Sequence, residues 1–177
     1  MLNNQQTLLH SIPSGDIGLI RQAIENGADV NHIHDIDGTG MRLSYLHTAA
    51  AAGRYDVMDL LVSKGANVNA RSRDGETPLQ FAAAANNVAG ARLLLSSGAH
   101  LDAEDKNKVT AIEEAVANNH SEMTQLLSER GAQKSLRVVE MIHQKEDQQP
   151  APLSRDRITA RRAQASVTPA VKAKVAL

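Results

Sequence analysis

Apolar positions in this chain occur in short clusters separated by polar turns, and the clearest set runs from Asp74 to Ala99. The spacing of apolar residues predicts one short helix after Thr77 and a second helix over about 88–96, both with an apolar face. We expect the following residues to face the core: Leu79, Ala82 and Ala83 on the first helix, and Leu93, Leu94 and Leu95 on the second.

The ends of both helices carry recognisable signals. Thr77 offers a capping oxygen, and Pro78 occupies the first helical position, where its missing N–H costs nothing. Gly98 is expected to end the second helix in the left-handed conformation, which only glycine adopts cheaply. Asp74-Gly75, ahead of the first helix, is typical of a tight turn. Together these signals predict a unit made of a turn, two short helices and a loop.

This unit is repeated along the chain. A glycine-alanine step recurs at one constant spacing, as Gly65-Ala66, Gly98-Ala99 and Gly131-Ala132, and the step from Gly27-Ala28 to Gly65-Ala66 is longer by five positions. A shift by this constant period aligns 44–50 and 110–116 with 77–83. A fixed period between about 20 and 50 residues indicates a solenoid, in which each unit buries its apolar face only by stacking on its neighbours.

The 33-residue period and the Thr77-Pro78-Leu79 opening resemble the ankyrin-repeat family, whose opening motif is T-P-L-H-x-A. The resemblance covers about 130 residues. It implies an all-α solenoid of helix-turn-helix units with β-hairpin-like fingers, and a concave surface of finger tips and first helices that grips another protein.

Four units are expected, followed by two further segments. The first unit is a degenerate N-terminal cap, the second has an enlarged finger, and an amphipathic helix over about 135–147 either covers the open end of the stack or is offered to a partner. We interpret 149–177 as a disordered basic tail. The expected segments are 1–36, 37–70, 71–103, 104–135, 136–148 and 149–177.

Composition narrows the class of protein. The chain has 177 residues, of which 42% are hydrophobic and 2% aromatic, with no Cys and no Trp. The absence of cysteine excludes disulfides and Cys-ligated metal sites. No apolar run is long enough to span a membrane, and the N-terminus lacks the features of a secretory signal. We expect a cytoplasmic protein, of the producing cell or, after leaderless secretion, of a host.

Charge is distributed unevenly. Residues 1–150 carry 13 Lys and Arg against 19 Asp and Glu, a balance of −6, whereas 151–177 carry 6 against 1, a balance of +5. The basic tail could contact nucleic acid or an acidic membrane electrostatically, although it has no interleaved aromatics for base stacking. A solvated tail or a short docking segment for a protein is the alternative.

The resemblance places candidate binding residues on the finger tips. These residues are Arg71, Arg73, Glu76, Glu104 and Lys106, with Val109 beside them. The exposed positions of the first helices are Ala51, Ala52, Ala84, Ala85, Ala117 and Asn118. A rim of alternating charges that only contacts water is the alternative interpretation of the tips.

Five extra residues enlarge the finger between the first two units. Its apolar residues are expected in an exposed loop, and clustered exposed apolar groups mark interaction sites. The candidates are Ile33, Ile36, Met41, Arg42, Leu43 and Tyr45, the last in the place of the family's proline. Alternatively, Ile33 and Leu43 pack back onto the enlarged hairpin.

No metal-binding, catalytic or nucleotide-binding motif in the sequence is complete. Asp35, Asp37 and Gly40 resemble the start of a calcium loop, but Leu46 stands where the bidentate Glu is needed. His32 and His34 lack a third zinc ligand at a fixed spacing. No nucleophile–base pair or nucleotide motif occurs, so we expect no catalytic site, cofactor, metal or small-molecule substrate. The resemblance gives His47 a structural role, a hydrogen bond to turn backbone.

Overall fold

The computed structural model describes residues 3–35 and 40–132, and this part of the chain is mostly helical. Its eight helices form four successive pairs, and one short two-stranded antiparallel sheet lies between the first two pairs. The helices are α1 (Asn4–Ser14), α2 (Ile17–Glu25), α3 (Tyr45–Ala51), α4 (Tyr55–Ser63), α5 (Pro78–Ala84), α6 (Val88–Ser96), α7 (Ala111–Ala117) and α8 (Ser121–Glu129). The strands are β1 (Ile33–Asp35) and β2 (Arg42–Ser44), with His34 opposite Leu43.

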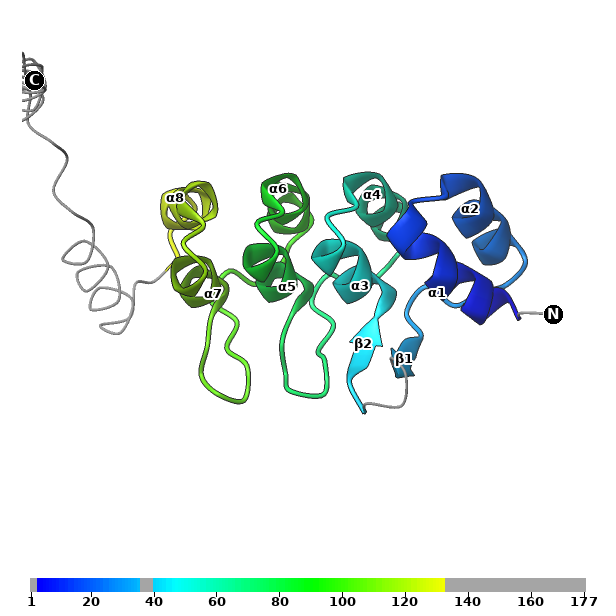
Figure 1. Cartoon of the computed structure of the whole chain (residues 1–177), viewed down its shortest axis with the longest axis horizontal. Helices are drawn as coiled ribbons and strands as arrows, with labels where there is room; N and C mark the ends of the chain where they lie inside the picture. Colours follow the sequence, from blue (N-terminus) through cyan, green and yellow to red (C-terminus); the bar gives the residue numbers. More distant parts are fainter. Residues whose placement is uncertain (1–2, 36–39, 133–177) are drawn as a thin grey trace, which may run out of the picture. The chain divides into compact units, whose positions relative to one another are not determined.

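The helix pairs stack in chain order (Figure 1). Within a pair the two helices pack on each other, and α3, α5 and α7 also pack side by side, as do α2, α4, α6 and α8. We call the segments 33–44, 71–77 and 104–110, which precede α3, α5 and α7, the fingers. The fingers project on the same side of the row formed by α3, α5 and α7 (Figure 1). The expected β-hairpin-like finger is present with two strands before α3.

The first helix of each later pair begins as the sequence predicts. Thr77 Oγ1 accepts a hydrogen bond from the Gln80 backbone N–H, and Pro78 is at the first helical position. Ser44 and Thr110 form the same reciprocal capping box one period away, with His47 and Glu113 as the respective partners. Recurring caps therefore start each helix at an equivalent position.

The predicted helix end is also confirmed, since Gly98 has φ of +88°. The same left-handed conformation recurs one period away at Gly65 and Gly131. In the turn ahead of the first helix, Gly75 has φ of +83°, and Lys108 occupies the equivalent position with φ of +64°. A lysine in this region carries backbone strain that glycine avoids.

The core consists mainly of leucine, isoleucine, methionine, valine and alanine side chains, together with Tyr45. Of the three leucines expected in the core on α6, only Leu94 is fully buried, whereas Leu93 and Leu95 are partly exposed. The expectation for these two was wrong because consecutive helical residues point about 100° apart, so three in a row cannot share one face.

Side-chain hydrogen bonds join each pair to the one before it. Arg54 Nε donates to the carbonyl oxygen of Pro13 over 2.9 Å, Asn87 Nδ2 to that of Ala50 over 3.3 Å, and His120 Nδ1 contacts that of Ala83 at 2.9 Å. The three side chains follow one another at the period of the repeat. Each donates to a backbone carbonyl near the end of the preceding first helix, where the regular intrahelical hydrogen bonds stop.

Two expected segments lie outside the described residues: the helix over about 135–147 and the basic tail at 149–177.

Candidate protein-binding surface

One side chain on α3 and one on α5 tie the helix to the next finger. His47 Nε2 lies 3.0 Å from the carbonyl oxygen of Glu76, and Gln80 Nε2 donates to that of Val109 over 2.7 Å. Glu76 and Val109 are equivalent residues of successive fingers. These bonds fix the finger orientation relative to the helices.

His47 is fully buried, and burial lowers its pKa to about 4 despite the hydrogen bond to Glu76, which opposes the shift. At neutral pH the imidazole is therefore uncharged. Its Nδ1 lies 2.7 Å from Ser44 Oγ and accepts from the Ser44 N–H, so Nε2 carries the proton and donates to Glu76. The structural role expected of His47 is confirmed.

The fingers are also bonded to one another. The Arg73 N–H donates to the carbonyl of Arg42 over 3.2 Å, and the Lys106 N–H donates to that of Asp74 over 2.9 Å. The guanidinium of Arg71 donates to the carbonyl of Glu104 over 2.7 Å. Neighbouring fingers thus form a connected backbone surface rather than independent loops.

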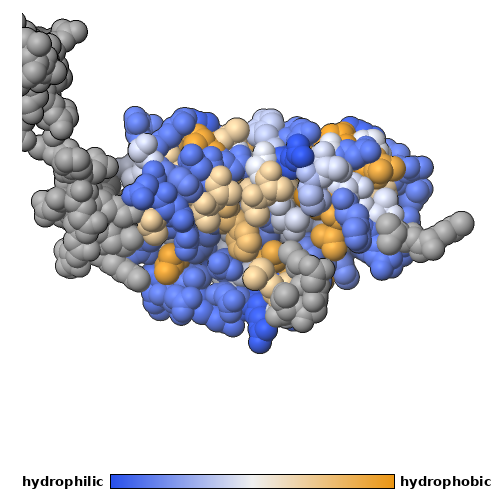
Figure 2. All heavy atoms as spheres, viewed as in Figure 1, coloured by the Kyte–Doolittle hydropathy of each residue, from blue (hydrophilic) through white to orange (hydrophobic). Residues whose placement is uncertain are grey.

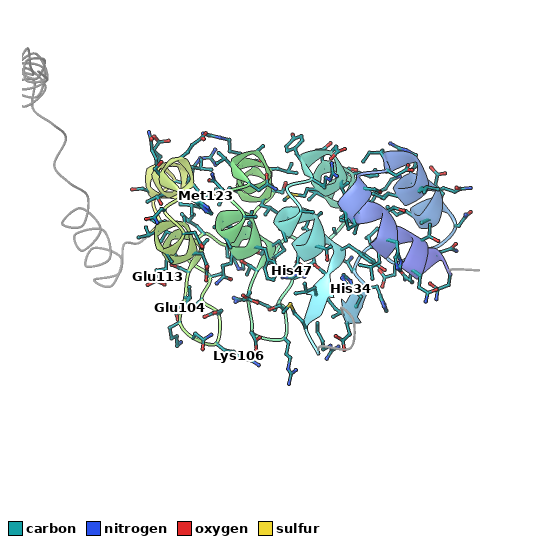
Figure 3. All side chains as sticks on the ribbon, in the orientation of Figure 1. His34, His47, Glu104, Lys106, Glu113 and Met123 are labelled. Atoms are coloured by element: carbon teal, nitrogen blue, oxygen red, sulfur yellow. The ribbon has the colours of Figure 1, made fainter. Side chains whose placement is uncertain are left out.

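The tip residues expected to bind a partner differ in their contacts. Arg73 and Lys106 are exposed on adjacent fingers, and Figure 3 places Lys106 at a finger tip. Arg71 is exposed but bonded to backbone carbonyls, and Glu104 pairs with Lys108 over 3.0 Å. Glu76 is partly buried and accepts a hydrogen bond from Ser72 Oγ. The Arg73 guanidinium also donates to the Gly40 carbonyl, over 3.4 Å, so Lys106 has the charged group most accessible to a partner among these tip residues.

The enlarged finger departs from the expected exposure. Met41 is 45% exposed and Arg42 is exposed, but Leu43 is 3% and Tyr45 1% exposed. The expectation that Leu43 lies in an exposed loop was wrong, and the alternative that it packs back onto the hairpin agrees with its burial. Tyr45, a candidate for contact with a partner, is buried as well. Ile33 is partly buried, and Ile36 lies outside the described residues.

Tyr45 is buried because it ties two helix pairs together. Its hydroxyl donates to the backbone carbonyl and to Oε1 of Gln5 on α1, over 3.1 and 2.9 Å. Its ring stacks on the imidazole of His34, with 5.0 Å between ring centroids. Leu43 lies opposite His34 on β2, so the base of the enlarged finger forms part of the core.

The solvent-facing positions of the first helices carry small side chains. All six expected to be exposed are exposed: Ala51, Ala52, Ala84, Ala85, Ala117 and Asn118. Figure 2 shows pale orange, moderately apolar residues near the middle of this face and blue, hydrophilic residues along the fingers below. We call the surface formed by the fingers and these six residues the finger–helix face.

A row of three chemically different side chains crosses the finger–helix face. Thr48, Phe81 and Glu114 occupy equivalent positions on α3, α5 and α7, and each is partly exposed. Phe81 is the one phenylalanine of the chain. Its ring contacts the His47 imidazole edge-on, with centroids 5.2 Å apart.

Sequence reasoning missed several side chains that connect the repeats. Asn31 Nδ2 donates to the carbonyl of Gly65 and Asn69 Nδ2 to that of Gly98, over 3.1 and 3.0 Å. The signal was available, because each asparagine follows a helix-ending glycine by four residues. These bonds lie at the loops and position the stack rather than the finger–helix face.

No cluster of three or more His, Asp or Glu suited to a metal ion occurs within residues 3–35 and 40–132. Among the same residues, no helix is long and apolar enough to cross a membrane.

This stack of paired helices with bonded fingers defines a repeat protein, and comparison with known families identifies which one. The family described as ankyrin repeats in three copies matches residues 46–138. The chain belongs to the ankyrin-repeat family.

Individual relatives match over fewer residues. The chain is 34% identical to the 2-5A-dependent ribonuclease of Mus musculus over 82 residues, which are 46% of this chain and 11% of that protein. It is 40% identical to the E3 ubiquitin-protein ligase hecd-1 of Caenorhabditis elegans over 68 residues, 38% of this chain and 2% of that protein. It is 38% identical to M-phase phosphoprotein 8 of Rattus norvegicus over 72 residues, 41% of this chain and 8% of that protein.

The matched region is thus a small part of each of these relatives. Ankyrin repeats generally mediate protein–protein interaction, and an ankyrin-repeat domain is typically non-catalytic.

Proposed function

We propose that this chain is a non-catalytic adaptor or inhibitor that binds one partner protein on its finger–helix face. The observation that carries the proposal is the row of exposed small residues on α3, α5 and α7, flanked by fingers that are hydrogen-bonded to one another. Small side chains let a partner approach the helices closely, and a surface held rigid before binding loses less entropy when the partner docks.

Within this proposal the chain is a four-unit solenoid with the boundaries given above, closed by the helix over 136–148 and followed by the basic tail at 149–177. The exposed candidates Met41, Arg42, Arg73 and Lys106 contribute contacts at the finger tips. Leu43 and Tyr45 support the enlarged finger from below, because both are buried.

The experiment places one bulky charge on the proposed surface and an identical charge elsewhere. Ala84 is exposed on α5, within the finger–helix face, and Ala89 is exposed on α6, a second helix. Ala84→Arg and Ala89→Arg therefore make the same chemical change at two exposed helical sites. Each variant and the wild type would be used to capture proteins from an extract of the producing cells, with identification by mass spectrometry.

A protein recovered with the wild type and with Ala89→Arg, but lost with Ala84→Arg, supports the proposal. The binding of the recovered protein would then be repeated with purified components. Equal recovery with both variants, or turnover of a small molecule by the purified chain, contradicts it.

A second candidate function rests on the +5 balance of residues 151–177. In this alternative the tail attaches the protein to nucleic acid or an anionic membrane, and the repeats serve as a scaffold. Deleting 149–177 distinguishes this alternative from binding on the finger–helix face. If the tail makes the attachment, the attachment is sensitive to salt and the deletion should remove nearly all of it. Binding on the finger–helix face predicts little loss.

A further inference from the structure

The row Thr48–Phe81–Glu114 differs in chemistry from the alanines around it. The three side chains project from equivalent positions of α3, α5 and α7, which pack side by side. Packed helices are about 8–10 Å apart, so one extended segment of a partner can contact all three positions. The row offers a hydroxyl, an aromatic ring and a carboxylate in sequence.

Phe81 lies in the middle of this row and is only partly buried. Its ring makes a T-shaped contact with the buried imidazole of His47, with 80° between the ring planes. A partly exposed aromatic ring is a favourable surface for the aliphatic stem of Lys or Arg and attracts the cation itself.

Glu114, the next member of the row, lies among carboxylates. Burial raises the pKa of Glu114, and the charges of Glu76, Asp105 and Glu113 raise it further, in that order. Among residues 3–35 and 40–132, the ion pair formed is Lys108–Glu104, so the Glu114 carboxylate lacks a cationic partner in this part of the chain. Within the described residues, the Glu114 carboxylate therefore forms no ion pair at its partly desolvated position on α7.

The cations of the finger–helix face are located elsewhere. The exposed cations lie on the finger segments, whereas Glu114 is on α7; these cations are Arg42, Arg71, Arg73, Lys106 and Lys108. A partner that complements both regions needs a positive group over the helices.

We propose that the finger–helix face recognises a segment of the partner that presents a Lys or Arg side chain, with its stem across Phe81 and its charged group at Glu114. This inference rests on the proposed function and names the chemistry of the partner. A buried or half-buried charge pair of this kind selects partners, because a segment without the cation leaves Glu114 desolvated and unpaired.

The test uses a displayed library of random peptides selected on the immobilised wild-type chain. The expected result is enrichment of peptides that carry a Lys or Arg next to an apolar residue. The dissociation constant of one enriched synthetic peptide would then be measured for the wild type, Glu114→Gln and Phe81→Leu. We expect each variant to weaken binding by about tenfold or more, as for a partly desolvated interaction.

Glu122→Gln is the matched control, since Glu122 is an exposed carboxylate on the second helix α8. It removes the same charge and should leave binding unchanged. Replacing the basic residue of the peptide with norleucine should weaken binding to the wild type but add little to the effect of Glu114→Gln, because coupled groups are not additive.

Two results would overturn this inference. One is the absence of enriched peptides or of a basic preference among them; the other is equal binding to Glu114→Gln and Glu122→Gln. Enriched peptides that lack a basic residue but are lost with Ala84→Arg would overturn the basic-segment inference and leave the proposed function intact. Failure of the proposed function is detected separately, by equal protein capture with Ala84→Arg and Ala89→Arg.

Discussion

The imidazole of His34 stacks on the ring of Tyr45, with 5.0 Å between the centroids and 20° between the planes. His34 is 7% exposed, and its Nε2 lies 3.1 Å from Thr48 Oγ1, whereas its Nδ1 has no hydrogen-bond partner among the described residues. Burial and, to a smaller extent, the charge of His32 lower the pKa of His34 to about 4. The base of the enlarged finger thus depends on a neutral histidine.

Acid should therefore destabilise the fold. His34 and His47 both have pKa values of about 4 in the folded chain, against an ordinary value of 6.5. Between these values the unfolded chain binds more protons, so their contribution to the free energy of unfolding is complete above pH 6.5 and falls as the pH drops toward 4. Each unit of pKa difference corresponds to about 1.4 kcal/mol. Chemical denaturation measured between pH 6.5 and pH 4 should show this fall in the free energy of unfolding.

His47→Gln provides the control for this pH dependence. The equivalent Gln80 accepts from the Thr77 N–H and donates to Val109, so glutamine can replace both hydrogen bonds of His47 without titrating. At neutral pH the variant should unfold within ~1 kcal/mol of the wild type. Its stability should decline less between pH 6.5 and 4, and a decline identical to that of the wild type would show that His47 does not contribute.

Leu94 and Leu95 test the orientation of α6. Leu94 is 0% exposed, and its truncation to alanine should cost about 2–5 kcal/mol of unfolding free energy through cavity formation. Leu95 is partly exposed, so Leu95→Ala removes the same atoms at a smaller cost. Equal losses in chemical denaturation would mean that the helix faces the core differently.

Replacing Lys108 with glycine should stabilise the fold. Lys108 adopts φ of +64° where the equivalent Gly75 has +83°, and a left-handed lysine costs about 1–2 kcal/mol. The flexibility of glycine in the unfolded chain offsets about 0.5–1 kcal/mol of the gain, and loss of the exposed pair with Glu104 offsets little. Lys108→Gly should raise the free energy of unfolding by about 0.5 kcal/mol.

Lys108→Ala distinguishes the effect of backbone strain on stability from the effect of losing the lysine charge. Alanine loses the ion pair but keeps the strained backbone, so this variant should gain nothing in the same denaturation experiment. An equal gain for alanine and glycine would rule out backbone strain as the cause.

The sequence predicted the features that recur with the period. Thr77, Pro78 and Gly98 act through their own backbone and their nearest neighbours, so their roles follow from local chemistry. Exposure of the six first-helix positions was implied by the resemblance to ankyrin repeats, in which equivalent residues of stacked units meet equivalent surroundings.

The enlarged finger could not be predicted in the same way. The burial of Leu43 and Tyr45 depends on His34 and on Gln5, which lies 40 residues before Tyr45. An insertion has no equivalent in the other units, so the periodic argument gave no information about where its side chains pack. The environment of Glu114 was missed for a similar reason, because Glu76, Asp105 and Glu114 come together only in the fold.

Substitutions at Met41 and Leu43 test two roles of the enlarged finger, contact with a partner and support of the fold. Met41 is 45% exposed, so Met41→Asp should leave the melting temperature nearly unchanged and weaken binding of the partner captured on the finger–helix face, because docking would bury an unpaired charge. Leu43 is 3% exposed, so Leu43→Asp should lower the melting temperature strongly by placing a charge in the core. Both are measured by thermal unfolding and by titration with the purified partner. If Met41→Asp binds as tightly as the wild type, the finger supports the fold at its base and the contact surface lies along Phe81, Arg73 and Lys106.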